Sequence, residues 1–249
     1  MKIRSLLPAT VVCACFSVGF AQSKSLTRLK NSSDHGNVLS ETNLGIDYVE
    51  GVGAPKDYAK AVVLFKKAAA QGYAAAEINL GIMYNFGRGV PQDYAKAAYW
   101  YRKAADQGNA AAEGRLGYLY QQGQGVPQDY AKAAYWYRKA ADQGNAVAEN
   151  DLGYMYNLGQ GVPQDYAKGA YWDRKAADQG YAEAEFNLGY MYEQGLGVPQ
   201  NYEDAYFWFD LAAAQGIKGA ASVRDAVAHM MTSAELADAQ RRASAWKPQ

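Results

Sequence analysis

Apolar side chains recur at helical spacing in short blocks along the chain. In residues 73–108, Ala76, Leu80 and Tyr84 fall at i, i+4 and i+8. This is the spacing of an apolar stripe on one face of an amphipathic helix. The pattern therefore predicts a first helix over about residues 74–85.

Loop-forming residues separate this helix from a second one. Gly87 and Gly89 end the first helix, because glycine adopts positive φ in a tight loop. Pro91 and Asp93 follow, the first acceptable before a helix start and the second a good N-cap. A second apolar stripe that contains Trp100 then predicts another helix, which a glycine ends.

The same block recurs at a constant step of 36 residues. The copies are residues 37–72, 73–108, 109–144, 145–180 and 181–216. Tryptophan alone shows the step, at Trp100, Trp136, Trp172 and Trp208. Because one helical hairpin of this size cannot bury its own apolar stripe, its stability must come from stacking on its neighbours. The sequence therefore predicts an all-α solenoid of helix-loop-helix repeats.

Residues 217–249 close the predicted stack. Residues 217–231 have the pattern of a first helix without the loop signature after it. Thr232 and Glu235 then have the spacing of a capping box, which opens a further helix. We interpret this segment as C-terminal capping helices over the last repeat.

Residues 1–21 have the layout of a secretory signal peptide, with a basic start, an apolar stretch and small residues before the cut. The stretch is shorter than the roughly 20 residues that span a bilayer, and no apolar stretch in the mature chain is longer. Two alternatives stay open, an uncleaved anchor and a lipid on Cys15. Residues 22–36 are polar and predict a flexible tether. We expect an exported protein, periplasmic or secreted.

Composition removes several classes of function. The chain has 25 basic and 25 acidic side chains and lacks a basic run, which argues against a nucleic-acid binder. Only two histidines and two cysteines are present, and both cysteines, Cys13 and Cys15, lie in the leader. We therefore expect no metal site, no cofactor and no thiol chemistry in the mature chain.

The repeated elements LGxxY, GxGVPQDYxKAxxW and KAAxQGxA closely resemble the Sel-one-like repeat (SLR) family, relatives of the tetratricopeptide repeats. The resemblance covers residues 37 to about 246. It implies a right-handed superhelix that serves as a scaffold for protein-protein contacts. It also implies, for exported bacterial members, roles in cell-envelope assembly, signalling or host contact. Some secreted cysteine-rich members suggest an alternative, a β-lactam- or cell-wall-directed enzyme or binding protein, but this mature chain lacks their cysteines.

Catalytic groups are scarce. The Ser-x-x-Lys signature of serine β-lactamases is absent, and neither His35 nor His229 has a partner evident in the sequence. The repeated carboxylates have structural roles available, as helix N-caps and as first-turn residues that the helix dipole stabilises. We therefore predict that the chain is not an enzyme. A passive spacer in the envelope is a further alternative.

A partner should bind where the repeats differ. On the first helices, two varying positions lie on the face opposite the apolar stripe. In the family's superhelix, that opposite face lines the concave groove. From these positions we predict a surface for a protein, peptide or glycan, because tyrosine is a rigid amphipathic contact residue. The predicted surface comprises Asn79, Arg115, Tyr118, Asp151, Tyr154, Asn187 and Tyr190. The alternative is that these tyrosines pack between adjacent first helices.

Three further residues break the repeat. Gly114 and Gly169 lie inside predicted helices, where alanine is more favourable by roughly 1 kcal/mol. Asp173 replaces the tyrosine of the two preceding copies. Drift between copies and a local binding pocket both account for these differences.

Overall fold

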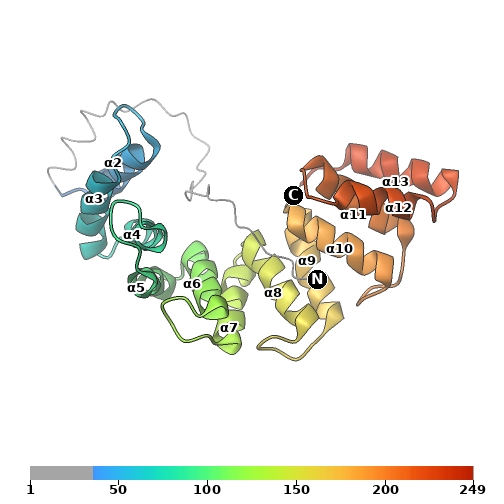
Figure 1. The fold of residues 1–249 in the computed structure, drawn as a ribbon, viewed down its shortest axis with the longest axis horizontal. Coiled ribbons are helices and arrows are strands. Elements are labelled where there is room, and N and C mark those ends of the chain that lie inside the picture. Colours follow the sequence, from blue (N-terminus) through green and yellow to red (C-terminus); the bar gives the residue numbers. More distant parts are fainter. Residues whose placement is uncertain (1–35, 249) are drawn as a thin grey trace. The chain divides into compact units, whose positions relative to one another are not determined.

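The computed structural model describes residues 36–248, and every regular element in that range is a helix (Figure 1). The predicted signal peptide, Cys15 and the tether up to residue 35 lie outside the described residues. The helices are α2 (Val38–Glu50), α3 (Tyr58–Ala70), α4 (Ala74–Phe86), α5 (Tyr94–Asp106), α6 (Ala110–Gln122), α7 (Tyr130–Asp142), α8 (Ala146–Leu158), α9 (Tyr166–Asp178), α10 (Ala182–Gln194), α11 (Tyr202–Ala214), α12 (Ala220–Ala228) and α13 (Ser233–Ala245).

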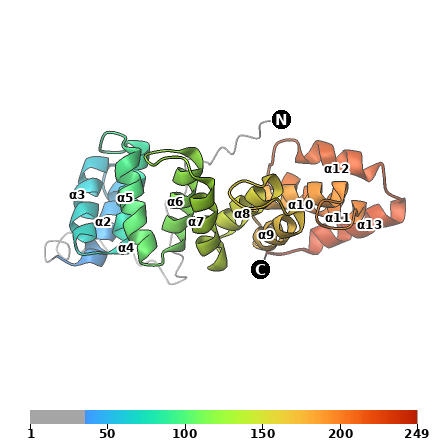
Figure 2. The same ribbon diagram turned by 90° about the horizontal axis from the view of Figure 1, so that it is seen from below.

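Consecutive helices pack as hairpins, and the chain forms two compact units. Of the described residues, 36–111 belong to the N-terminal unit and 112–248 to the C-terminal unit. In the C-terminal unit, α8 packs on α9 and α10 on α11, while α12 and α13 both contact α11 and lie on either side of it (Figure 2). The predicted all-α solenoid of helical hairpins is confirmed.

The helices begin and end where the sequence pattern places their boundaries. Asp129, before α7, accepts a hydrogen bond from the Lys132 backbone N–H at 2.9 Å. The same N-cap bond forms at Asp57, Asp93 and Asp165. The first helix of the repeat ends at a left-handed glycine, such as Gly159 with φ of 67° after α8. The repeated loop is therefore fixed by backbone geometry that only a few residue types adopt.

In four of the five repeats, an aromatic ring on the second helix packs against a glycine on the first. A methyl group added to Gly117 in α6 would lie 2.9 Å from the ring of Tyr137 in α7. The same arrangement joins Gly45 to Phe65, Gly81 to Tyr101 and Gly189 to Phe209. Any larger side chain at these glycines would separate the two helices. The four rings are fully buried as a result.

A buried carboxylate also joins the two helices of a repeat. Glu113 in α6 is fully buried, and its carboxylate accepts a hydrogen bond from Gln143 at 2.6 Å and pairs with Lys139 at 3.1 Å. The lysine ammonium in turn lies 4.9 Å from the ring centroid of Trp136. Glu77 and Glu149 make the same contacts with Lys103 and Gln107, and with Lys175 and Gln179. These first-turn glutamates therefore do more than interact with the helix dipole, because they also join the two helices.

The last helix covers the end of the stack. Thr232 and Glu235 form the reciprocal capping box that opens α13. Arg242 of α13 pairs with Asp204 of α11 at 2.7 Å and lies over the ring of Phe207. Phe207 is consequently buried, unlike the exposed tyrosines at the same position of the preceding repeats.

Candidate interaction surface

Three tyrosines of the predicted surface lie on α6, α8 and α10 of the C-terminal unit. Tyr154 and Tyr190 are 38% and 49% exposed, and Tyr118 is half-buried. In the N-terminal unit the same repeat position is held by Ile46, which is half-buried, and by Ile82, which is buried. The position thus changes along the chain from a packed aliphatic residue to tyrosines that reach solvent.

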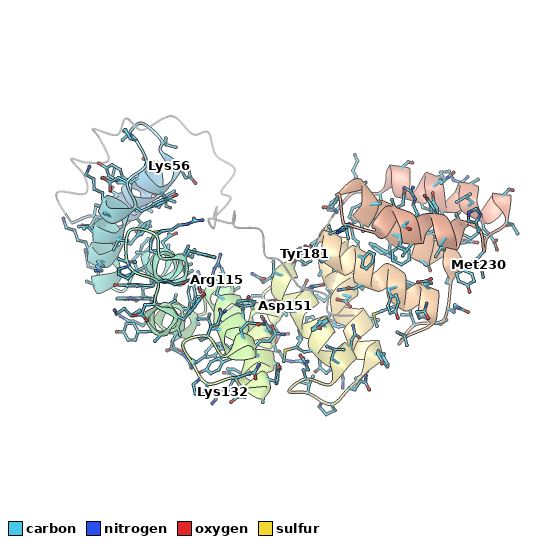
Figure 3. All side chains as sticks on the ribbon, viewed as in Figure 1. Lys56, Arg115, Lys132, Asp151, Tyr181 and Met230 are labelled. Atoms are coloured by element: carbon cyan, nitrogen blue, oxygen red, sulfur yellow. The ribbon has the colours of Figure 1, made fainter. Side chains whose placement is uncertain are left out.

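Arg115, Asp151 and Asn187 precede these tyrosines by three residues, so each shares a helix face with its tyrosine. All three are half-buried. Arg115, Asp151 and Tyr181 lie along one side of the C-terminal unit, and Lys132 lies on the opposite side (Figure 3). The six residues Arg115, Tyr118, Asp151, Tyr154, Asn187 and Tyr190 are called the tyrosine face below.

Asp151 is the acid at the centre of the tyrosine face. Burial raises its pKa to about 7, and the nearby charge of Glu183 raises the pKa further, while a hydrogen bond with Tyr137 opposes the shift. Asp151 and Glu183 also raise the pKa of the Tyr181 hydroxyl, although burial contributes most to that shift. Asp151 therefore holds its proton more tightly than an exposed aspartate does.

Asn187 connects the tyrosine face to a buried polar group beneath it. Its side-chain amide donates to Asn150 of α8 at 2.9 Å. Burial holds the pKa of Asp173 well above its usual range, against the lowering effect of hydrogen bonds with Asn157 and Asn187. Asp151 adds to the upward shift of that pKa. Asp151 on the tyrosine face and the buried Asp173 thus interact electrostatically.

Asp173 occupies the position that an aromatic ring fills in the other hairpins. The carboxyl is fully buried, and a methyl group added to Gly153 would lie 2.7 Å from its Oδ1. Asn157 leans into the same space and donates to Asp173 Oδ2 at 3.3 Å. A methyl group on Gly169 would collide with Asn157, which explains why this repeat has glycine where the others have alanine.

Two buried oxygen atoms in this group, Oδ1 of Asp173 and Oδ1 of Asn157, have no hydrogen-bond partner. The repeat sequence shows that Asp173 is unusual, but it does not show that the side chain is buried or that it contacts Asn157. Those contacts join residues 16 positions apart on opposite helices. Only the packing of α8 on α9 reveals them.

Asn79 is placed differently from the other predicted residues. It lies in α4 of the N-terminal unit, is buried, and donates its side-chain amide to the Ala75 carbonyl at 2.8 Å. An amide satisfied within its own helix has little to offer a partner. We therefore leave Asn79 out of the surface proposed below.

A second set of exposed tyrosines, on the second helices, lies outside the predicted surface. Tyr135 and Tyr171 are 56% and 57% exposed, and each packs edge-on against the following tryptophan at 5.0 Å. A shallow pocket of about 260 Å³ lies beside Tyr171, lined also by Arg174, Leu188 and Tyr192. The strict 36-residue repetition of these tyrosines was the signal that could have identified them.

Within residues 36–248, no three His, Cys, Asp or Glu side chains come together in a way that could hold a metal ion. His229 is exposed at the end of α12. None of the helices described is both long and apolar enough to span a membrane.

Comparison with known proteins gives a consistent result. The Sel1 repeat model matches residues 38–73, 74–109, 110–145, 146–181 and 182–217. No curated protein matches the chain. A Sel1 repeat protein from Oxalobacter formigenes is 30% identical, with a TM-score of 0.77 over 90% of this chain and 91% of that one. A Klebsiella pneumoniae protein described as a putative Sel1 repeat protein shares the fold at 23% identity and a TM-score of 0.53.

A protective antigen present in uropathogenic Escherichia coli strains is also similar, with 41% identity and a TM-score of 0.74. The match covers 77% of this chain but only 41% of the antigen, so this chain spans less than half of that protein's length. The Sel1 repeat fold is typical of scaffolds for protein-protein interaction, and Sel1 repeat proteins are generally non-catalytic. The five matched repeats and the similar solved structures show that this chain belongs to the Sel1 repeat family.

Proposed function

We propose that this protein is a non-catalytic, exported scaffold that binds a segment of a partner protein on its tyrosine face. The observation that carries the proposal is the exposure of Tyr154 and Tyr190 at the repeat position where Ile82 of α4 is buried. Exposed tyrosines beside polar groups are typical of protein contact surfaces. Export is supported by the leader in residues 1–21, and it places the partner in the periplasm or outside the cell.

The repeat architecture suits a partner segment that is extended. Equivalent tyrosines on α6, α8 and α10 recur once per hairpin, so an extended chain that crosses the helices meets the same chemistry at regular intervals. The residues three positions earlier are a base, an acid and an amide, in that order along the chain. These differences give each interval its own preference, which is how a repetitive surface becomes selective.

We expect the triple variant Tyr118→Ala, Tyr154→Ala and Tyr190→Ala to bind its partner with at least about tenfold lower affinity. Aromatic residues supply much of the binding energy at protein contacts. The partner would first be captured from the periplasmic or secreted fraction with the mature chain. Its affinity for the wild-type protein and the variant would then be measured by titration calorimetry. Circular dichroism would establish that the variant retains its helical content.

The chain offers a matched control on the other helices. The triple variant Tyr99→Ala, Tyr135→Ala and Tyr171→Ala also removes three tyrosines, all of them exposed, from α5, α7 and α9. It should bind the partner as the wild type does. A partner that is lost from this control and retained by the first variant would move the contact to the second helices and contradict the proposal.

A further inference from the structure

The last repeat lacks the lysine that compensates the buried glutamate in the three preceding repeats. Glu185 in α10 is fully buried, like Glu113 and Glu149. Gln215 donates to its Oε2 at 2.9 Å, as the equivalent glutamine does for Glu77, Glu113 and Glu149. The lysine position, however, is Leu211. Glu185 Oε1, the atom that pairs with lysine in the earlier copies, is buried without a hydrogen-bond partner.

The charged groups on the helices packed around Glu185 are engaged elsewhere. Arg174 of α9 donates to the Tyr192 hydroxyl and lies over the ring of Trp208. Arg242 of α13 pairs with Asp204, and Lys175 of α9 pairs with Glu149. The charges that remain nearby in sequence are Asp178 at the end of α9, Glu183 on the same helix and Lys247 after α13, and Lys247 is exposed. Burial raises the pKa of Glu185, and the hydrogen bond from Gln215 opposes that shift.

The end of the chain covers this part of the last repeat. Trp246, just after α13, packs edge-on against Trp208 with ring centroids 6.2 Å apart. A methyl group added to Gly180 would lie 3.0 Å from Pro248 and 3.7 Å from Trp246. Gln215 also donates to the Gly180 carbonyl at 3.1 Å, so one glutamine links Glu185 to the segment on which the chain end rests.

We propose that Glu185 is a proton-dependent switch for the C-terminal helix, neutral while α13 is packed on α11 and able to release α13 when it ionises. A buried carboxylate is tolerated in the earlier repeats because a lysine ammonium lies beside it. In the last repeat, loss of the proton leaves the charge uncompensated. Lifting α13 uncovers Phe207 and Trp208, which Arg242 and Trp246 contact, and in the proposed switch it also admits water to Glu185 and relieves that cost.

The direction of the pH effect follows from the pKa. Burial raises the pKa of Glu185 to about 7, whereas an exposed glutamate titrates near 4.3. A raised pKa means that the packed form binds the proton more tightly than the open form. The contribution of protonated Glu185 to α13 docking is therefore complete below about pH 4 and is lost as the pH rises through about 7.

Hydrogen-deuterium exchange of the α13 amides tests this proposal. After correction for intrinsic exchange rates, protection of residues 233–245 should fall at least about tenfold between about pH 5.5 and about pH 8. Glu185→Gln keeps an acceptor for Gln215 but cannot ionise, so its protection should be the same at both pH values. Leu211→Lys restores the lysine of the earlier repeats and should keep α13 protected at the higher pH.

Glu183→Gln provides the control, because it removes an exposed acid from the same helix and should leave the pH dependence unchanged. The proposal is overturned if protection of α13 in the wild type does not change with pH. It is also overturned if Glu185→Gln retains the whole of the pH dependence. Circular dichroism at each pH would show that the rest of the solenoid stays helical.

Discussion

Replacing Trp136 with alanine should lower the free energy of unfolding by about 3 to 5 kcal/mol, the range for removing a buried tryptophan. The indole is only 5% exposed in α7. Because α7 packs against α8 of the next repeat, the cavity would weaken stacking as well as the hairpin itself. Few single substitutions in this chain remove as much packed surface.

The loss of Trp136 also disturbs a charge. Its ring lies 4.9 Å from the Lys139 ammonium, which pairs with the fully buried Glu113. Without the ring, the lysine is held less firmly beside an acid that depends on it. The urea midpoint of the helical circular dichroism signal would measure the combined effect.

Tyr135→Ala is the matched control for Trp136→Ala, since Tyr135 is the adjacent residue and 56% exposed. It should cost less than about 1 kcal/mol, as expected for an exposed position. Equal losses in the two variants would show that the tryptophan contributes no more than its exposed neighbour, and would contradict the packing argument.

The helices could be predicted from the sequence because each one carries its own boundary signals. The predicted helix over about residues 74–85 is Ala74–Phe86 in the structure, and the predicted N-cap Asp93 precedes α5. Apolar periodicity, loop glycines and N-caps act within a few residues of one another. Repetition then extends one such prediction to all five copies.

Contacts across a hairpin could not be predicted in the same way. The first-turn glutamate of each repeat looks like a helix-dipole residue, yet Glu113 is paired with a glutamine 30 positions away. Asp173 looks like drift between copies, yet it is buried against Asn157. Periodicity identifies the face of a helix, but it does not identify which side chains reach the neighbouring helix.

The candidate surface lies between these two cases. Variation between copies singled out the tyrosines, and the structure exposes Tyr154 and Tyr190. The same criterion also selected Asn79, whose burial depends on the Ile-rich packing of α4 and on its bond to Ala75. Variation thus marks where repeats differ, whereas exposure decides which differences a partner can contact.

Replacing Asp173 with asparagine should raise the free energy of unfolding by about 2 to 4 kcal/mol at about pH 8. Burial holds the pKa of Asp173 well above its usual range, so at this pH the fold must either keep the proton or bury a charge. Asparagine has nearly the same shape and carries no charge. Its amide can also donate to Asn157 Oδ1, which has no partner in the wild type.

The gain from Asp173→Asn should depend on pH in a defined direction. A raised pKa contributes stability below the unfolded value of about 3.9 and loses it as the pH rises. The advantage of the asparagine variant should therefore be small near pH 4 and grow toward neutral pH. Urea unfolding at several pH values would measure it.

Asp165→Asn is the control with the opposite sign. Asp165 caps α9, and its hydrogen bonds from Lys168 lower its pKa, so its contribution is lost as the pH falls. Asparagine is also a good N-cap, and this variant should be unchanged or slightly less stable at about pH 8. If Asp173→Asn also left the free energy of unfolding at about pH 8 unchanged or slightly lower, the buried carboxyl of Asp173 would have to be ionised without cost. That result would require a compensating donor within reach of its Oδ1, where the fold supplies none.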